Sequence, residues 1–422
     1  MVEVTVEELR QVIDRAIEQE MRSNATKVGR YWYPLSLATY GSEEVLEALE
    51  SMLGFRTTMG GKTVAFENAF AKWQSASDAV MVNSGSSADL LLCLLLANPS
   101  QPMIQPGDEI LIPVVTWPTQ IWSAMMAGLK VKLVDVDPAT LNVDLDDLEA
   151  SITPRTRALF LVHIMGNPCN MERIVAIANR HKLTIIEDCC EAMGASFDGT
   201  RVGNFGVGGA FSFFFSHHIT TMEGGMIVVN SATDADRLRL LRAHGWTRAT
   251  RSPQYDIGDF PDIDPRYAFV SWGLNVRPME VQAGFGLHQL ARADDFAIRR
   301  AFLASRFGAF VDRSPFLAMP VVDPRAVPSW LALPLMVSVD APFSRAEITA
   351  YLEAAGIETR PIVTGNMARH PVAKLFPEFG ARKFAGADQI HDRGFYIGLS
   401  PMQSDQSFDR LLDVFSGYLR KF

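Results

Sequence analysis

Short apolar runs alternate with stretches of helical period through the middle of the chain. The runs lie between residues 79 and 230 and read AVMVNSG, EILIPVVTW, VKLVDVD, ALFLVHIMG, LTIIEDCC, GAFSFFF and GMIVVN. Most have the length of one buried strand, and helical patterns or turns separate them. This rhythm predicts an α/β domain built on a mixed, mostly parallel sheet that is flanked by helices.

The last third of the chain has a different pattern. ALPLMVSVD and IETRPIV indicate strands, and the segment from about Ser344 to Ala355 indicates a helix. We therefore predict an N-terminal helical arm over residues 1–40, a large α/β domain over 41–300 and a smaller C-terminal α+β domain over 301–422.

One polar segment interrupts the large domain. Residues 247–270 are rich in Pro and Asp and include DIGDFPDIDPRYAFV. Long segments of this kind inside compact domains are more often functional than idle. We expect this segment to be an excursion near a site or a subunit interface.

Composition and charge narrow the function classes. The chain has 422 residues, of which 48% are hydrophobic, and this is ample for a large core and one or two domains. A net charge of −9 without a basic stripe argues against a nucleic-acid partner. The N-terminus has no apolar leader, and LLLCLLLA is too short to cross a bilayer. We expect a cytoplasmic protein with no membrane partner.

The four cysteines are Cys93, Cys169, Cys189 and Cys190. None belongs to a CxxC pattern, so we interpret them as reduced, mostly structural thiols and expect no metal site.

Polar residues follow the ends of several predicted strands. In parallel sheets, ligands gather at the carboxyl ends of the strands. The residues at these ends are Ser84 to Ser87, Trp117, His163, Asp188 and His217.

Each of these features has two readings when it is taken alone. The NSGSSADL turn suits an anion at a helix N-terminus or an ordinary capped helix. Asp188 can pair with a cationic ring nitrogen or with a structural cation. Trp117 can stack on a flat ring or pack in the core. His163 is interpreted as a satisfied core histidine, with a cofactor contact as the alternative.

The order of the motifs carries more information than any one of them. The series is FENAFAKW, VNSGSSADL, TWPTQ, VDVDPATLNVD, IIEDCCEAMGA, SFFFSHHITTMEGG and GLNVRPMEVQAGFGLHQL. It resembles the DegT/DnrJ/EryC1/StrS sugar aminotransferase superfamily from about Tyr33 to about Pro401. The resemblance implies pyridoxal phosphate (PLP) as cofactor and an aspartate-aminotransferase-like fold of PLP fold type I.

One position departs from the pattern of that superfamily. Its strand-turn-strand motif normally reads SFF-x-x-K-x-I-T-T-G-E-G-G, and the lysine holds PLP covalently. Setting ITTMEGG on ITTGEGG places His217 at the lysine, and no lysine lies between Lys182 and Lys374. A histidine carries protons near neutral pH but cannot hold the cofactor covalently.

The Lys-to-His exchange resembles an offshoot, the nucleotide-sugar 3-dehydratases that make 3,6-dideoxysugars such as those of lipopolysaccharide O-antigens. GNPCNM and TRPIVTGNMARHP are also similar to that offshoot. Its members use pyridoxamine phosphate (PMP). One variant carries a 2Fe–2S cluster on cysteines beyond an HGWGR motif, whereas HGWTRATRSPQYD contains none, so we expect no iron-sulfur cluster. The chain resembles the cluster-free group, which includes GDP-4-keto-6-deoxymannose 3-dehydratase.

The resemblance implies a reaction and its partners. The substrate is a nucleotide-linked 4-keto-6-deoxyhexose, and L-glutamate serves as the amino donor that regenerates PMP from PLP. GDP, CDP and dTDP sugars stay open as alternatives. Two other functions also stay open: a related PLP- or PMP-dependent nucleotide-sugar enzyme such as an aminotransferase with a displaced base, and a non-catalytic homologue that binds the cofactor.

The resemblance also assigns roles to residues. His217 is the proposed base, and Asp188 pairs with the pyridine nitrogen. The cofactor-binding residues that it implies are Ser86, Ser87, Trp117, Asp188, Glu191, Ser212 and Asn275.

Four further assignments follow from the same resemblance. Asn275 matches an asparagine that reaches the phosphate from the neighbouring subunit, which implies a homodimer with shared active sites. Ser216 and Arg360 are candidate substrate contacts, with an exposed salt bridge as the alternative for Arg360. His218 is interpreted as a structural neighbour whose ring points away from the site.

Overall fold

The computed structural model describes residues 5–27, 31–98, 102–252, 255 and 257–422. Its centre is a seven-stranded sheet with the strand order β1-β9-β8-β5-β4-β2-β3. Strand β9 runs antiparallel to both of its neighbours, β1 and β8, and the other strand pairs are parallel, so the sheet is mixed and mostly parallel, as the sequence predicts. The strands are β1 (Asp78–Val82), β2 (Glu109–Pro113), β3 (Lys130–Val134), β4 (Thr156–Val162), β5 (Thr184–Asp188), β8 (Gly208–Ser212) and β9 (Gly225–Val229).

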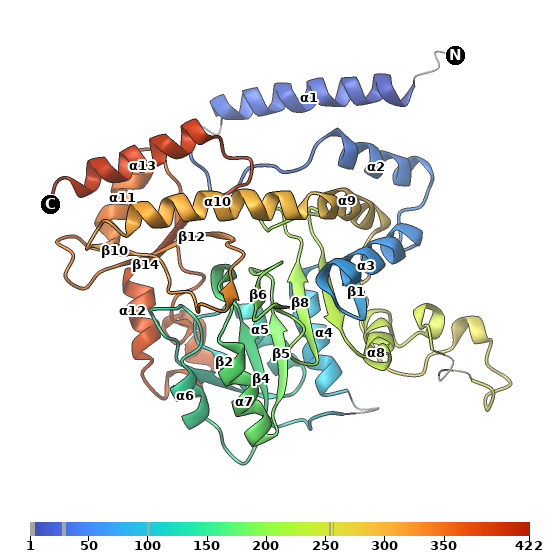
Figure 1. The fold of residues 1–422 in the computed structure, drawn as a ribbon. Helices are drawn as coiled ribbons and strands as arrows, with labels where there is room; N and C mark the ends of the chain where they lie inside the picture. Colours follow the sequence, from blue (N-terminus) through green and yellow to red (C-terminus); the bar gives the residue numbers. More distant parts are fainter. Residues whose placement is uncertain (1–4, 28–30, 99–101, 253–254, 256) are drawn as a thin grey trace.

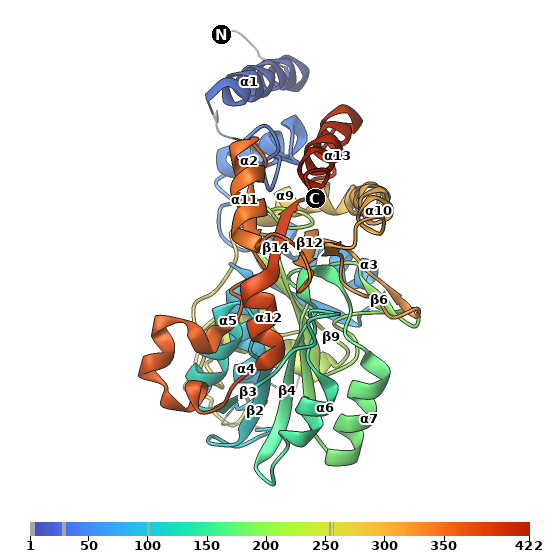
Figure 2. The same cartoon turned by 90° about the vertical axis from the view of Figure 1, so that its left-hand side faces the viewer.

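Helices cover both faces of this sheet (Figure 1, Figure 2). Successive strand residues point to opposite faces, and Ile185 and Ile186 of β5 accordingly belong to different apolar clusters. One face packs against α4 (Gly85–Leu96), α5 (Pro118–Met126), α8 (Ala232–Arg242) and α12 (Ala385–Arg393). The other packs against α3 (Gly61–Gln74), α6 (Leu145–Ala150), α7 (Met171–His181) and α9 (Glu280–Ala291).

The C-terminal part of the chain forms a second core around an antiparallel sheet, which includes Tyr33 from the N-terminal part. This sheet has the order β10-β12-β14-β13. Its strands are β10 (Leu317–Ala318), β12 (Ala332–Val337), β13 (Thr359–Pro361) and β14 (Gly394–Gly398), and its helices are α10 (Ala293–Val311), α11 (Arg345–Ala354) and α13 (Asp405–Leu419). Helix α11 confirms the helix predicted there. The domain boundary at residue 300 stays a prediction, and α10 runs through that position.

Short elements complete the chain. A small third sheet consists of β6 (Ser196–Phe197), β7 (Thr200–Arg201) and β11 (Ala326–Val327). The 3₁₀ turns are η1 (Ile164–Gly166), η2 (Thr247–Ala249), η4 (Pro265–Tyr267), η5 (Met367–Arg369), η6 (Pro371–Leu375) and η7 (Pro377–Gly380). Within the described residues, no helix has the length and apolarity needed to cross a bilayer.

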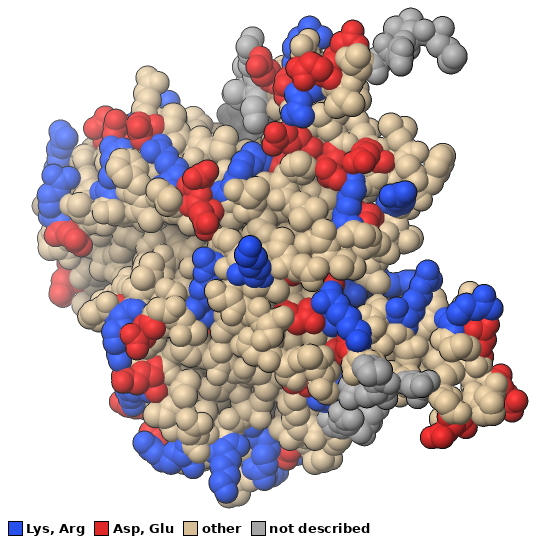
Figure 3. Space-filling model, turned by 45° about the vertical axis from the view of Figure 1, so that its right-hand side comes forward, with Lys and Arg blue, Asp and Glu red and all other residues tan. Residues whose placement is uncertain are grey.

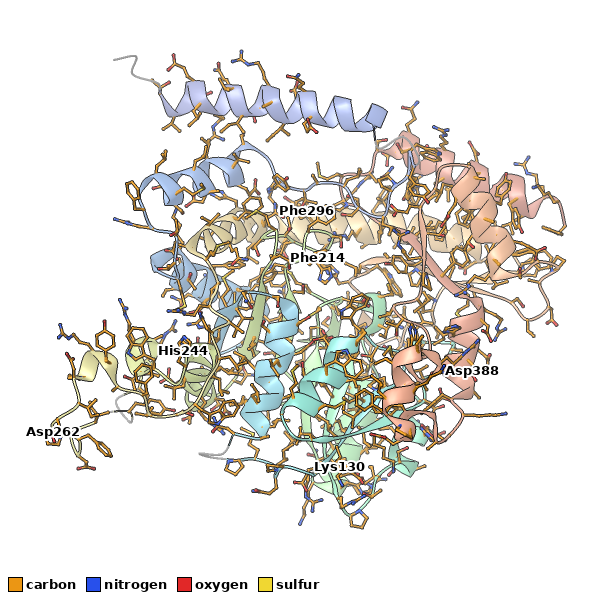
Figure 4. The ribbon with its side chains drawn as sticks, turned by 180° about the vertical axis from the view of Figure 1, so that it is seen from behind. Lys130, Phe214, His244, Asp262, Phe296 and Asp388 are labelled. Atoms are coloured by element: carbon orange, nitrogen blue, oxygen red, sulfur yellow. The ribbon has the colours of Figure 1, made fainter. Side chains whose placement is uncertain are left out.

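Two segments extend from the body of the molecule. Helix α1 (Val6–Lys27) lies along α2 (Ser42–Leu53) at the top of Figure 1. Residues 257–270 of the polar segment project at one side, and Figure 4 places Asp262 at the far end. Trp246 stacks on Tyr267 at the base of this projection. Over the described residues visible in Figure 3, basic and acidic side chains are interspersed.

Candidate active site

A cavity of about 410 Å³ lies at the carboxyl ends of β4, β5 and β8, where α4 and α5 begin. Its size is typical of small-molecule sites. It brings together seven of the residues predicted from the sequence, which are Ser86, Trp117, Asp188, Glu191, Ser212, Ser216 and His217. Within the described residues, no lysine lines this cavity.

Asp188 forms the floor of the cavity. It ends β5, and 5% of its surface is exposed. One carboxylate oxygen accepts a hydrogen bond from the Cys190 N–H at 2.8 Å, and the other accepts one from the Gln120 side-chain amide. Burial raises the pKa of this carboxyl above its ordinary value. No lysine or arginine of the described chain forms an ion pair with Asp188, so its carboxylate is open to pairing with a cation that enters the cavity.

The turn before α4 and the end of β8 form one wall. Ser84 caps α4, because its side chain accepts the Ser87 N–H at 3.1 Å. Gly85 lies so close to Ser212 that a Cβ atom at Gly85 would sit 2.5 Å from the Ser212 Cβ. Ser86 therefore faces the cavity beside Ser212 at a helix N-terminus, an arrangement that suits a phosphate. The Ser87 hydroxyl instead donates to Asn83 at 2.6 Å and does not line the cavity.

The turn between β8 and β9 differs from the predicted strand GAFSFFF. Strand β8 ends at Ser212, and Phe214 and Phe215 are exposed in the turn, near the centre of the molecule in Figure 4, where Phe214 is labelled. The chain leaves the sheet because the His217 N–H bonds back to the Phe214 carbonyl at 2.9 Å. Met222, which stands where the superfamily has glycine, has a φ of 68° in the left-handed region that favours glycine.

His217 reaches the cavity from this turn. Its Nδ1 is buried and has no hydrogen-bond partner. Burial lowers the pKa of His217 to about 4, and the nearby Arg300 charge acts in the same direction. The imidazole is therefore neutral at physiological pH and free to accept a proton. The ring of His218 donates to the Ser329 carbonyl at 2.9 Å, is buried and does not line the cavity, and its structural role stays a prediction.

Arg300 of α10 holds the histidine turn in place, and no motif in the sequence points to it. This buried guanidinium donates to the carbonyls of His218 at 3.0 Å and His217 at 3.3 Å, and also to that of Leu399 at 3.2 Å. Burial lowers the pKa of Arg300 to about 10, so it is still charged at neutral pH. No sequence signal separates it from its neighbour Arg299, which is more exposed.

We expect Arg300→Met to lower the free energy of unfolding by about 3 kcal/mol, because three buried carbonyls lose a charged donor. Turnover falls as well, since the backbone on both sides of His217 loses its anchor. Denaturant unfolding and steady-state kinetics check this. Arg299→Met is the matched control, because Arg299 pairs with the exposed Asp405. A folded Arg300→Met protein with unchanged turnover would contradict the anchoring role.

Three more residues complete the walls. Trp117 caps α5 and is 58% exposed, so its ring is open to stacking and is not packed in the core. Glu191 accepts the Met165 N–H at 2.8 Å, and burial raises its pKa to about 7. Tyr396 of β14 also lines the cavity, and the sequence analysis did not identify it.

His163 lies outside the cavity lining. Its Nδ1 accepts the Cys169 N–H at 3.0 Å, so its Nε2 carries the proton that points to Glu187 at 3.2 Å. It is fully buried, as predicted for a core histidine.

Asn275 and Arg360 also lie outside the cavity. Asn275 is exposed in a separate groove, where the Arg277 guanidinium donates to its side chain at 2.9 Å. Arg360 of β13 forms an ion pair with Glu358 at 2.6 Å near the surface. Its register partner on the neighbouring strand β14 is Tyr396. Within the described residues Asn275 does not line the cavity, and its contact with the phosphate of a neighbouring subunit stays a prediction.

The cavity fits a pyridoxal-type cofactor by its own chemistry. A buried carboxylate without a cation suits a protonated ring nitrogen, an exposed indole suits a flat ring, and two hydroxyls at a helix N-terminus suit a phosphate. The buried Nδ1 of His217, a residue of the cavity lining, also has no hydrogen-bond partner and is available to a bound group.

Comparisons with known proteins agree with this reading. A GDP-4-keto-6-deoxy-D-mannose 3-dehydratase of Yersinia pseudotuberculosis is 35% identical over 388 residues, which is 90% of this chain and 98% of that protein. The Escherichia coli GDP-4-keto-6-deoxy-D-mannose-3-dehydratase with bound hydrated PLP is 32% identical, with a TM-score of 0.84 and coverage of 91% and 99%. A structure of GDP-4-keto-6-deoxymannose-3-dehydratase with a trapped PLP-glutamate geminal diamine has a TM-score of 0.82 at 33% identity, with coverage of 90% and 99%.

The similarity therefore covers the sheet, the cavity and the C-terminal core together, and it shows the fold of the type I aminotransferases. The family model for these proteins matches residues 39–416, and the chain is a member of the DegT/DnrJ/EryC1/StrS aminotransferase family.

Proposed function

We propose that this protein is a PMP-dependent 3-dehydratase of a nucleotide-linked 4-keto-6-deoxyhexose. The observation that carries the proposal is the neutral imidazole of His217 in the cavity lining, at the residue that the ITTMEGG motif aligns with the lysine of the superfamily. An aminotransferase of this family needs an amine there, and none of the described lining residues supplies one.

The cofactor, when bound, supplies the electron sink and the amine that engages the sugar's ketone. The protein supplies orientation and charge. Asp188 would hold the proton on the ring nitrogen, and Trp117 would stack on the ring. Ser86 and Ser212 bind the phosphate with the N–H groups that begin α4.

His217 moves the proton. Its imidazole is neutral above about pH 4, so one ring nitrogen is free to accept a proton, and with the cofactor bound that proton would come from the carbon next to the amine. Once protonated, it is a general acid for the hydroxyl that leaves carbon 3. Arg300 fixes the backbone from which the ring projects. A histidine that accepts and then returns one proton is sufficient for an elimination.

L-Glutamate is the amino donor in this proposal. The similar protein trapped with a PLP-glutamate adduct supports it. The exposed position of Asn275 supports a homodimer in which each chain contributes this asparagine to the phosphate site of its partner.

The first test is an absorbance spectrum of the protein with PLP, before and after L-glutamate, with 2-oxoglutarate assayed. We expect the aldehyde band to convert into a pyridoxamine band and 2-oxoglutarate to form. GDP-, CDP- and dTDP-linked 4-keto-6-deoxyhexoses are then supplied, and we expect a 3-deoxy product and ammonia from one of them. A 4-amino sugar as the product would instead identify an aminotransferase. Binding of PLP without turnover of any donor or sugar would indicate a non-catalytic homologue.

A further inference from the structure

The floor of the cavity contains a second carboxyl group, Asp89 of α4. Asp89 follows Ser86 by three residues, so both side chains lie on the same face of the helix and line the cavity. Its side chain is fully buried, and its Oδ1 has no hydrogen-bond partner. The Gln120 amide, at 3.4 Å, is a distant donor to its Oδ2.

Asp89 and Asp188 lie close enough to repel each other if both are ionised. One oxygen of each, together with the Cys190 sulfur, falls within a group whose members are all within 4.8 Å of one another. No lysine or arginine of the described chain pairs with either carboxyl. Two carboxylates in such a dry site do not both ionise, and one proton is retained.

The hydrogen bonds decide which carboxyl keeps the proton. The Gln120 oxygen accepts from Thr116 at 2.7 Å, so its amide nitrogen faces the two acids. The Gln120 amide lies closer to Asp188 than to Asp89, and Asp188 also accepts the Cys190 N–H. Asp89 has only the distant contact with the Gln120 amide. Donors stabilise the charged form, which places the negative charge on Asp188 and the proton on Asp89. Burial and the Asp188 charge correspondingly hold the pKa of Asp89 well above its usual value.

We propose that Asp89 is a positioning residue, a neutral carboxylic acid that shares one proton with Asp188 across the Gln120 amide. The floor of the site then carries one negative charge, which matches one protonated ring nitrogen. The inference rests on the proposed function only in identifying the cation that pairs with Asp188 as the ring nitrogen of the cofactor. When that cation binds, it favours ionisation of Asp89, so cofactor binding releases part of a proton.

The other titratable groups around this pair leave the assignment unchanged. Burial raises the pKa of the Cys190 and Cys93 thiols, so both stay neutral. His163 lies near Asp188, and any positive charge on its ring lowers the pKa of that acid, which favours the same assignment. From α8, Arg237 contacts the carbonyl of Leu95, at the far end of α4. Gln120 of α5 and Ser212 of β8 do not titrate.

The test is the pH dependence of stability in the cofactor-free protein, with Asp89→Asn against the unaltered chain. An acid whose pKa is raised by folding penalises the folded state at every pH above its unfolded pKa of about 3.9. Asparagine cannot ionise. We therefore expect the free energy of unfolding to depend on pH in the same way in the two proteins near pH 4. Above that, the unfolding constant of the unaltered protein relative to the variant rises roughly tenfold per pH unit until the folded pKa is reached.

Asp409→Asn is the control, since Asp409 is an exposed carboxylate beside Arg306 and its variant should follow the unaltered protein. Parallel curves for Asp89→Asn and the unaltered protein would overturn the proposal. A second measurement needs no variant. The infrared difference spectrum on adding PLP at pH 7 should contain a carboxylic-acid C=O band that shifts in D₂O.

A difference spectrum without that band would overturn the proposal even if Asp89→Asn does not fold. Neither measurement requires a sugar to be dehydrated. A protein that fails to dehydrate any 4-keto sugar but shows both signals would refute the proposed reaction and leave the role of Asp89 standing.

Discussion

Turnover falls by about 10²- to 10⁴-fold when His217 is replaced by asparagine, the usual contribution of a general base. The reason is local: the neutral imidazole of His217 is the proton acceptor that faces the cavity, and an amide cannot take its place. PLP binding changes little, because Asp188, Trp117 and the serines remain. Steady-state kinetics with the accepted 4-keto sugar, and PLP titration by absorbance, separate the two effects.

His217→Lys gives the complementary result. The new amine forms a covalent bond with PLP that borohydride makes permanent and mass spectrometry detects on the peptide containing residue 217. Dehydration is lost, because the cofactor is no longer free to engage the sugar. His218→Gln is the matched control: it removes a ring that binds Ser329, so it changes stability and not the chemistry. Full dehydratase activity in His217→Asn would refute the assignment of the base.

Asp188→Asn is expected to lower turnover by about a thousandfold, a loss typical of removing a preorganised charge from the reacting centre. An amide at this position does not keep the ring nitrogen protonated, so the ring no longer draws electrons from the reacting carbon. The absorbance of bound PLP should shift at neutral pH, in addition to the loss of rate.

A structural carboxylate provides the comparison for that experiment. Asp236 is buried in an ion pair with Arg239 and lies outside the cavity lining. Its asparagine variant should lose stability without a change in the spectrum of bound PLP. An Asp188→Asn protein with the unaltered spectrum and rate would show that the floor carboxylate does not face the ring nitrogen.

The strands of the main sheet could be predicted from the sequence because each one has a local signal. LTIIED and GMIVVN are apolar runs bounded by turn residues, and they form β5 and β9. The partner of a strand is a different matter. β9 lies between β1 and β8 and is antiparallel to both, and this pairing rests on contacts between distant segments that periodicity does not encode. The run GAFSFFF misleads for a related reason, since its last phenylalanines leave the sheet for the turn.

The candidate site divides in the same way. Asp188, Ser212 and His217 follow strand ends, so their convergence was foreseeable from topology. Arg300 and Tyr396 come from elements about 80 and 180 residues further along, and their contribution depends on how α10 and β14 pack over the cavity. Asp89 lies inside the apolar helix α4. Its burial could be foreseen from that pattern, but whether Asp89 or Asp188 keeps the shared proton depends on hydrogen bonds that the sequence does not give.

None of the described residues that line the cavity carries an amine, and this affects how the protein would hold its cofactor. Contacts through Asp188, Trp117 and the serines are all reversible, so in the proposed function the residence time of PLP is an ordinary dissociation time. The loaded fraction then follows the free vitamer concentration by mass action. At one hundred times the dissociation constant, PLP adds about 2.7 kcal/mol to the folded state, and dilution removes it. PLP would exchange with the surrounding pool between catalytic cycles, as a co-substrate does.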